Sequence, residues 1–255
     1  MSGSILRRLA IVAVLCMAWQ GYALWLRNPL IFPTLTDTIA AWCHGVASGE
    51  LPYRAALSMK VLLAAYAAGI VLALALAIFA ALTRVGGDLL SVLTAMFMPL
   101  PGIALMPLAL LWFGFGPGGF VFVLIHAVIW PVAVNAHAGF AGVSPTLRLV
   151  GRNYGLRGLR LVALILIPAA VPSILTGLRL GWAFAWRTLI AAELVFGVTT
   201  GTGGLGWFIY QARNELALPD VFAGLLTIAV IGLVVEGVVF RTIDTVTVRR
   251  WGMLS

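Results

Sequence analysis

Two glycine-rich stretches have the spacing of a dinucleotide-binding loop. They read GFGPGG at residues 114–119 and GTGGLG at residues 201–206. This pattern binds a dinucleotide only where it follows a strand and opens a helix, and neither stretch does so. A P-loop would need a Gly-Lys pair, and the only lysine, Lys60, follows Met59. We therefore expect these glycines to form tight turns, and we expect any ATP chemistry to belong to another polypeptide.

The titratable side chains form no recognisable catalytic or metal-binding set. His44, His126 and His137 share no carboxylate pattern, and the last two are about three helical turns apart. We interpret them as buried or interfacial imidazoles rather than as a proton relay or a metal site. Cys16 falls at membrane depth and Cys43 in a loop, so we expect no disulfide between them.

The fifth apolar segment carries charges that could act on a solute: Arg179, Arg187 and Glu193. A guanidinium in lipid is costly, so Arg187 should face protein or water and have a partner. It is either a polar group on a translocation pathway that favours anions, or a packing residue paired with Glu193, Glu236 or backbone carbonyls. Arg179 lies closer to the helix end, where its side chain can reach the interface, which favours a packing role. All three are candidate pathway residues.

A basic island interrupts the apolar sequence at residues 144–161, SPTLRLVGRNYGLRGLRL. It holds four arginines and no acid, so it cannot rest in lipid and should be a cytoplasmic loop. Its pattern predicts a short helix capped by Ser144, started by Pro145 and ended by Gly155. The predicted apolar face and the predicted basic face consist of Leu147, Val150 and Tyr154, and of Arg148 and Arg152. Such an amphipathic helix would dock a cytoplasmic partner.

Composition sets the class of the chain. Of 255 residues, 62% are hydrophobic and 9% are charged, whereas a soluble domain carries about 25% charge. We therefore expect an all-α polytopic membrane protein that forms a single domain over residues 1–255. The net charge of +8 does not indicate nucleic-acid binding, because the arginines lie at the ends of apolar segments, where cytoplasmic loops collect positive charge.

Apolar segments long enough to cross a bilayer predict about six spans. They fall at roughly residues 9–26, 57–82, 89–113, 120–140, 165–189 and 221–240. We read the first as an uncleaved span rather than a signal peptide. The second is rich in alanine, so neighbouring helices can approach it closely. The third contains MPLPGIALMP, whose prolines should bend or break it.

The basic residues also predict orientation. With the N-terminus inside, ten arginines fall on inner segments, against three arginines and Lys60 on outer ones, which favours N-in and C-in. The outer side keeps a first loop at residues 28–56 with a surface helix, TLTDTIAAWCHGV, and a second loop at residues 193–220. Because no half of the chain is duplicated, we expect the pathway to form by pairing with a second copy.

The basic island resembles the signature loop of ABC-importer permeases. That loop has a Glu-Ala-Ala triplet, a glycine, nine residues and an I-x-L-P-like ending. Here Gly155 is followed by nine residues and then ILIP at residues 165–168. The triplet positions hold Leu149-Val150-Gly151, so the acid is missing, and Ile167 replaces the leucine.

Further segments are similar to permeases of the nitrate/sulfonate/taurine type, and they occur in the same order. They are SGEL (48–51), PLPGIALMPLALLWFGFG (99–116), IPAAVPSILTGLRLGWAFAWRTLIAAEL (167–194), GGLGWFIYQA (203–212), DVFAGLLTIAVIGLVVE (220–236) and RRW (249–251). The resemblance implies a type I importer permease in the bacterial cytoplasmic (inner) membrane. It implies two permease subunits, usually identical, two cytoplasmic ATPases that hold ATP and Mg, and an extracytoplasmic binding protein. This chain itself then needs no cofactor.

The resemblance also assigns a coupling helix at residues 146–155, which would transmit closure of the ATPases to the pathway. Its candidate residues are Thr146, Leu147, Arg148, Val150, Gly151, Arg152, Tyr154 and Gly155. We expect the importer to move a small organic anion, such as a sulfonate or taurine, by alternating access. Nitrate, bicarbonate, a pyrimidine vitamin precursor or a flavin are alternative solutes for the same architecture. A stand-alone secondary transporter or channel is the alternative class, and it would need no docking helix. An intramembrane enzyme would need a clustered acid/base or metal set.

Overall fold

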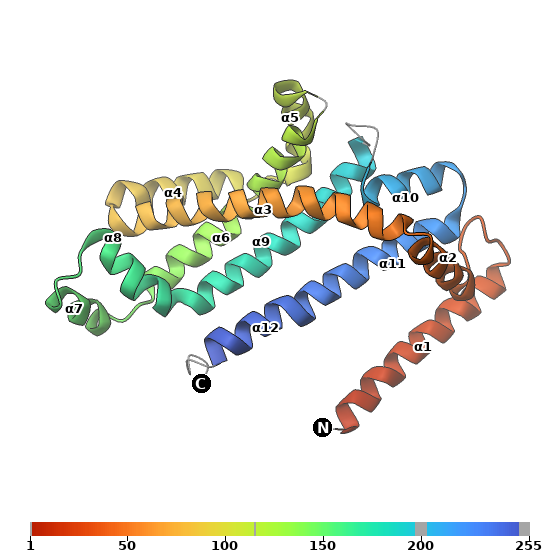
Figure 1. Cartoon of the computed structure of the whole chain (residues 1–255), viewed down its shortest axis with the longest axis horizontal. Coiled ribbons are helices and arrows are strands. Elements are labelled where there is room, and N and C mark those ends of the chain that lie inside the picture. Colours follow the sequence, from red (N-terminus) through yellow and green to blue (C-terminus); the bar gives the residue numbers. More distant parts are fainter. Residues whose placement is uncertain (1, 115, 197–202, 250–255) are drawn as a thin grey trace. The chain divides into compact units, whose positions relative to one another are not determined.

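The computed structural model describes residues 2–114, 116–196 and 203–249, and this part is helical without a strand (Figure 1). Its α-helices are α1 (Ser2–Leu26), α2 (Leu35–Ala47), α3 (Glu50–Leu82), α4 (Arg84–Phe97), α5 (Met106–Phe113), α6 (Pro117–Ala141), α7 (Pro145–Asn153), α8 (Gly158–Leu161), α9 (Ile167–Phe196), α10 (Leu205–Asn214), α11 (Leu218–Val234) and α12 (Arg241–Asp244). A 3₁₀ turn, η1 (Gly102–Leu105), precedes α5. Segments of π-helix join α8 to α9 and α11 to α12.

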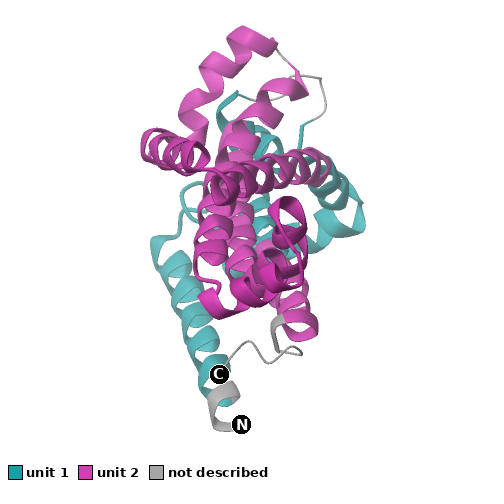
Figure 2. Ribbon diagram, turned by 90° about the vertical axis from the view of Figure 1, so that its left-hand side faces the viewer, with its two compact units in different colours: residues 1–58, 193–231 teal, residues 59–192, 232–255 magenta. Residues whose placement is uncertain are grey.

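The chain divides into two compact units, coloured separately in Figure 2. Unit 1 consists of residues 1–58 and 193–231, and unit 2 consists of residues 59–192 and 232–255. The long helices α3, α9 and α11 each contribute residues to both units. The cavity and the helix α7 of the candidate site belong to unit 2.

Within the described residues, five helical segments are long and apolar enough to cross a membrane. They are Leu6–Leu26, Glu50–Leu82, Pro117–Ala141, Gly158–Phe196 and Leu218–Thr247. A sixth crossing is possible where α4 and η1–α5 form a pair bent by 87°. The predicted all-α membrane fold with about six spans is thereby confirmed, and the orientation stays a prediction.

The predicted third span, residues 89–113, is not one straight helix, because the chain bends at its proline cluster. Pro99 and Pro101 have no N–H to donate, and their rings clash with the preceding turn of a helix. The helix α4 therefore ends at Phe97, and the chain starts again as η1 after Pro101. This break matters because it lines the cavity of unit 2.

Small residues let the helices of unit 2 approach closely. On α3, Ala73 and Ala77 are fully buried, which confirms that its alanine-rich face is a packing surface. A Cβ on Gly69 of α3 would lie 2.8 Å from a Val128 side-chain atom of α6. A Cβ on Gly139 of α6 would lie 2.7 Å from Cβ of Ser173 on α9. The helix α6 is thus packed against both α3 and α9.

The predicted helix of the first outer loop is present as α2. Thr34 caps it, and its hydroxyl accepts a hydrogen bond from the N–H of Asp37 at 3.1 Å. Both predicted glycine turns lie partly outside the described residues, at residue 115 and residues 201–202, as do the last residues of the RRW motif. Of the first turn, Gly114 has φ +69°, a conformation that glycine adopts without strain.

Candidate functional site: a membrane cavity and a docking helix

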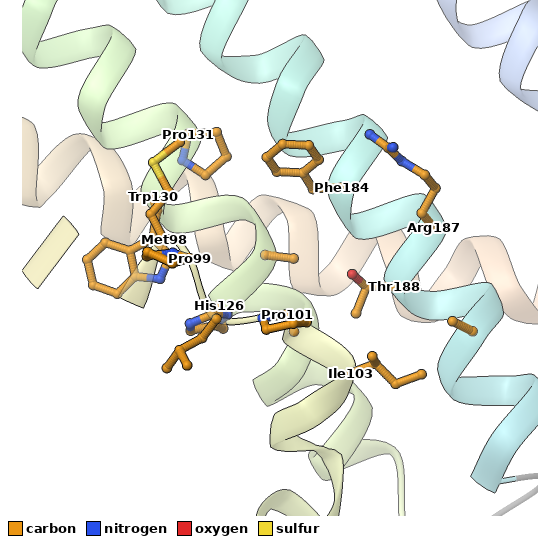
Figure 3. A pocket seen from close by; sticks show the side chains of 14 residues that line it. Met98, Pro99, Pro101, Ile103, His126, Trp130, Pro131, Phe184, Arg187 and Thr188 are labelled. Carbon is orange, nitrogen blue, oxygen red and sulfur yellow. The ribbon is translucent and has the colours of Figure 1, made fainter. Parts of the chain in front are cut away.

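A cavity of about 370 Å³ opens in unit 2 where α4 gives way to η1. Its lining comes from three places: the break at residues 98–103, the middle of α6, and one face of α9 (Figure 3). Because residues 98–101 are not helical, the chain leaves the axis of α4 beside α6 and α9. A volume of this size is typical of sites for small molecules.

Arg187 supplies the charge of this cavity. Its Nε donates to the carbonyl of Ala183, one turn earlier on α9, at 3.0 Å. Its guanidinium carbon lies 5.3 Å from the ring centre of Phe184, so the two side chains stack. Within the described residues, the ion pairs involve Arg54 and Arg179 and leave Arg187 without a carboxylate. The two terminal nitrogens of Arg187 therefore stay available to a bound group.

Other polar groups line the same cavity. Thr188 follows Arg187 on α9, and His126 and Trp130 face the cavity from α6 (Figure 3). The Nε1 of Trp130 is buried without a hydrogen-bond partner in the described part of the chain. The ring nitrogens of His126 are likewise buried without a partner of good geometry there. Phe97 stacks on Trp130 at 5.4 Å and 10°, and this stack holds the indole in place.

Close backbone packing shapes the wall that η1 forms. A Cβ on Gly102 would lie 3.1 Å from Cγ2 of Thr188 and 3.5 Å from the carbonyl oxygen of Val123. Glycine at this position therefore lets η1 lie directly on α9 and α6. The residues PLPG at 99–102 thus interrupt the predicted span and let η1 pack closely on α9 and α6.

Glu193 lies in unit 1 and is engaged by protein groups. Its side chain is buried, and its carboxylate accepts hydrogen bonds from the Ser58 hydroxyl at 2.9 and 3.0 Å. It also accepts from the N–H of Gly206 at 2.8 Å, while Ser58 accepts from the N–H of Leu205 at 2.9 Å. Glu193 and Ser58 thus satisfy the first free N–H groups of α10, which gives Glu193 a clear packing role.

Arg179 also has protein partners. One terminal nitrogen donates to the carboxylate of Asp244, and Nε lies 3.6 Å from Oε1 of Glu236. Its guanidinium carbon stacks 5.6 Å from the ring centre of Phe240. These contacts tie α9 to the last helical segments of unit 2. We expected Glu236 as one of several partners for Arg187, but in the structure Glu236 lies beside Arg179.

The predicted amphipathic helix of the basic island is present as α7. The hydroxyl of Ser144 accepts from the N–H of Leu147 at 3.3 Å, and Pro145 occupies the first turn. The helix ends before Gly155, whose φ of +77° suits glycine. The predicted apolar face is open, with Leu147, Val150 and Tyr154 exposed by 39%, 44% and 83%.

The two arginines of the predicted basic face differ in the structure. Arg152 is exposed, whereas Arg148 is half-buried. The guanidinium of Arg148 donates to the carbonyls of Phe140 and Val143, at and just beyond the end of α6. Arg148 thus caps α6 and fixes the connection to α7. Arg152 is free of such contacts in the described residues and faces outward.

Gly151 lets α7 pack closely against the segment that follows it. It is buried, and a Cβ on it would lie 2.9 Å from Cδ1 of Leu161 and 3.1 Å from Cγ1 of Ile165. Of the remaining predicted docking residues, Thr146 is exposed in the first turn. The predicted docking residues therefore form two groups. The contacts of one group build α7, and the side chains of the other lie exposed on its surface.

Sequence reasoning missed Ser58, Trp130 and Thr188. Ser58 carries no local signal, because its partners lie 135 and 147 residues away. Trp130 could have been noticed, since it stands one helical turn after His126 and directly before a proline inside a span. Thr188 could have been noticed as the neighbour of Arg187.

Comparison with known proteins places both parts of the site in one family. A family model described as "Binding-protein-dependent transport system inner membrane component" matches residues 65–251, which include the cavity and α7. The taurine transport system permease protein TauC of Escherichia coli K12 is 30% identical over 231 residues, 88% of this chain and 82% of that protein. The nitrate import permease protein NrtB of Synechocystis sp. is 27% identical over 244 residues, 92% of this chain and 86% of that protein.

Proposed function

Since the chain belongs to the family of binding-protein-dependent transport system inner membrane components, we propose that its solute is a small organic anion, such as a sulfonate or taurine. Membership makes it a permease subunit of an ABC importer and a multi-pass protein of the cytoplasmic membrane. The resemblance predicted from the sequence is confirmed at this level.

The observation that carries the choice of an anion is Arg187. A guanidinium within a membrane span costs several kcal/mol by most measures and is retained where it has a function or a partner. Arg187 has no carboxylate partner in the described residues, and it lines a cavity of about 370 Å³. The name of NrtB states nitrate, which is an anion, and the name of TauC states taurine, which carries a sulfonate group; both support a solute with an anionic group.

The proposed assembly follows the family. Two copies of this chain form the pathway, two separate ATPase subunits bind ATP and Mg, and an extracytoplasmic binding protein delivers the solute. The helix α7 docks in the ATPase through its exposed face and transmits closure of the ATPase pair. Its capped ends and open apolar residues support this role. Arg187 is the proposed pathway residue, while the contacts of Glu193 and Arg179 favour packing roles.

The assembly is tested by purifying the chain from its native membrane in mild detergent, with mass spectrometry of the proteins that come with it. A co-purifying ATPase, with a native mass that contains two copies of this chain, is the expected result. The chain alone, even after cross-linking, would instead indicate an autonomous transporter or channel.

The role of Arg187 is tested by ATP-dependent uptake into vesicles that contain the complex and its binding protein. Arg187→Ala should abolish uptake of a sulfonate or of taurine while the ATPase still co-purifies. Arg213→Ala, which removes an exposed guanidinium from α10, is the control and should keep both. If Arg187→Ala prevents assembly, the arginine has a packing role and the case for an anionic solute is lost.

A further inference from the structure

We propose that the cavity beside Arg187 is a binding station for an organic monoanion whose sulfonate or carboxylate head carries an uncharged, apolar body. This inference rests on the proposed function and narrows it, because it selects among the anions that such an importer could carry. Every lining residue belongs to unit 2.

The anionic head is assigned to Arg187. Its Nε is engaged by the Ala183 carbonyl at 3.0 Å, and stacking on Phe184 at 5.3 Å limits its rotation. Its terminal nitrogens stay free and form a planar fork, which matches two oxygens of one sulfonate or carboxylate. The arginine is thus held in place before a ligand arrives, which lowers the entropy cost of binding.

Two neutral donors line the cavity at other points of its wall (Figure 3). Thr188 follows Arg187 on α9 and has a hydroxyl that can donate to a bound group. Trp130 buries an Nε1–H that has no partner in the described residues. A buried donor without an acceptor is costly, so an acceptor from a ligand or a water is expected there.

The rest of the cavity suits carbon rather than a second charge. Its walls include Pro99, Pro101, Ile103 and Ala127 beside the ring of His126, and none of the described residues that line it is acidic. An ammonium group would therefore find no carboxylate. It would also find little free ring surface, because Phe97 covers one face of Trp130 and Arg187 lies over Phe184. A zwitterion such as taurine is disfavoured on this ground.

Volume argues against a compact inorganic ion. The cavity of about 370 Å³ falls in the range of pockets that hold small organic molecules. A four-atom ion such as nitrate would pair with Arg187 but would leave the proline and aliphatic walls wet. An anion with an alkyl or aryl body makes the same pairing with Arg187 and removes those walls from water, which favours its binding.

The test is equilibrium binding to the complex of this chain and its co-purifying ATPase in lipid nanodiscs, without the binding protein. The probe is radiolabelled benzenesulfonate, with hexanesulfonate, taurine and nitrate as competitors. Hexanesulfonate should compete well, whereas taurine and nitrate should need at least about tenfold higher concentrations. Arg187→Gln should weaken probe binding by about tenfold or more, since a charge-assisted hydrogen bond is lost.

Two further variants keep the test sharp. Arg213→Gln is the matched control and should bind the probe as the wild type does. Thr188→Val keeps the shape of the side chain and removes its hydroxyl, so it should weaken binding severalfold even if Arg187→Gln fails to assemble.

Three results would overturn the proposal: no binding of benzenesulfonate, equal competition by nitrate or taurine, or unchanged binding in both Arg187→Gln and Thr188→Val. These failures are separate from failure of the proposed function. A wild-type chain without an ATPase refutes the importer assembly, whereas a complex that imports a solute but does not bind benzenesulfonate refutes only the cavity site.

Discussion

The hydroxyl of Ser58 on α3 donates to the carboxylate of Glu193 on α9 at 2.9 Å, and the two side chains together receive the first N–H groups of α10. The pair therefore does two things within unit 1. It ties two long helices together, and it closes the N-terminus of the short helix α10. Arg54 adds to this cluster by donating to the Gly203 carbonyl at 3.0 Å.

Loss of the Glu193 charge should loosen α10. In Glu193→Gln the side chain keeps its size but turns an N–H₂ group toward donors, which should cost about 1–3 kcal/mol of stability. Hydrogen exchange of the α10 amides, residues 205–214, should then rise, and the apparent melting temperature should fall. Glu215→Gln, at the exposed end of the same helix, is the control and should change neither. Unchanged exchange in Glu193→Gln would show that the carboxylate does not hold α10.

Gly204 should tolerate no side chain, for a steric reason. Its φ of −79° is open to any residue, but a Cβ there would collide with Ser58 Oγ and the Glu193 carboxylate. Gly204→Ala should therefore cost about 1–3 kcal/mol, as overpacking usually does. The measurement is the apparent melting temperature of the purified protein.

Gly232→Ala on α11 provides the matched glycine control for this prediction. Among the described residues, no atom lies within 4 Å of a Cβ built at Gly232, so the substitution should be neutral or stabilise by up to about 1 kcal/mol. Equal melting temperatures for the two alanine variants would contradict the packing seen around Gly204.

The ion pair of Arg179 and Asp244 should contribute measurably to unit 2. The two side chains are 32% and 28% exposed, so solvent screens the pair only in part. A double-mutant cycle with Arg179→Leu and Asp244→Leu should give a coupling energy of about 1–2 kcal/mol. The same cycle with Glu236→Leu should give less than about 0.5 kcal/mol, because Glu236 is 61% exposed and 3.6 Å away. A coupling near zero for Asp244 would remove the case for Arg179 as a packing residue.

The spans and the helix of the basic island could be predicted because their signals are local. Apolar length determines where a helix can cross, and the Ser-Pro pair with a glycine ten residues after the proline marks the start and end of a short helix. The broken third span was also expected, since prolines without an N–H stand in its middle.

The side-chain partners could not be predicted in the same way, because they depend on distant segments. Arg148 and Arg152 look equivalent in the sequence, and only the nearby end of α6 makes one of them a cap. Glu193 looks like a partner for an arginine in the same segment, yet its donors come from α3 and α10.

The difference between Arg148 and Arg152 gives a test of the docking role of α7. Arg148→Ala should remove hydrogen bonds to the carbonyls of Phe140 and Val143 and lower stability by about 1–3 kcal/mol. Arg152→Ala with Tyr154→Ala should leave the melting temperature unchanged, since both side chains are exposed. This double variant should instead reduce the amount of co-purifying ATPase at least about tenfold, because it strips the outer surface of the helix of its charge and its largest apolar group.

The measurement is the ratio of ATPase to permease after mild-detergent purification, together with the apparent melting temperature of each variant. Arg157→Ala is the control, since Arg157 is exposed in the same loop but lies beyond the end of α7. Arg157→Ala removes one positive charge from the loop, as Arg152→Ala does. Retention of the ATPase in Arg157→Ala therefore excludes a general effect of lost positive charge. If the double variant keeps its ATPase, or if all three variants lose it equally, α7 does not dock through this face and the basic residues serve only to orient the chain in the membrane.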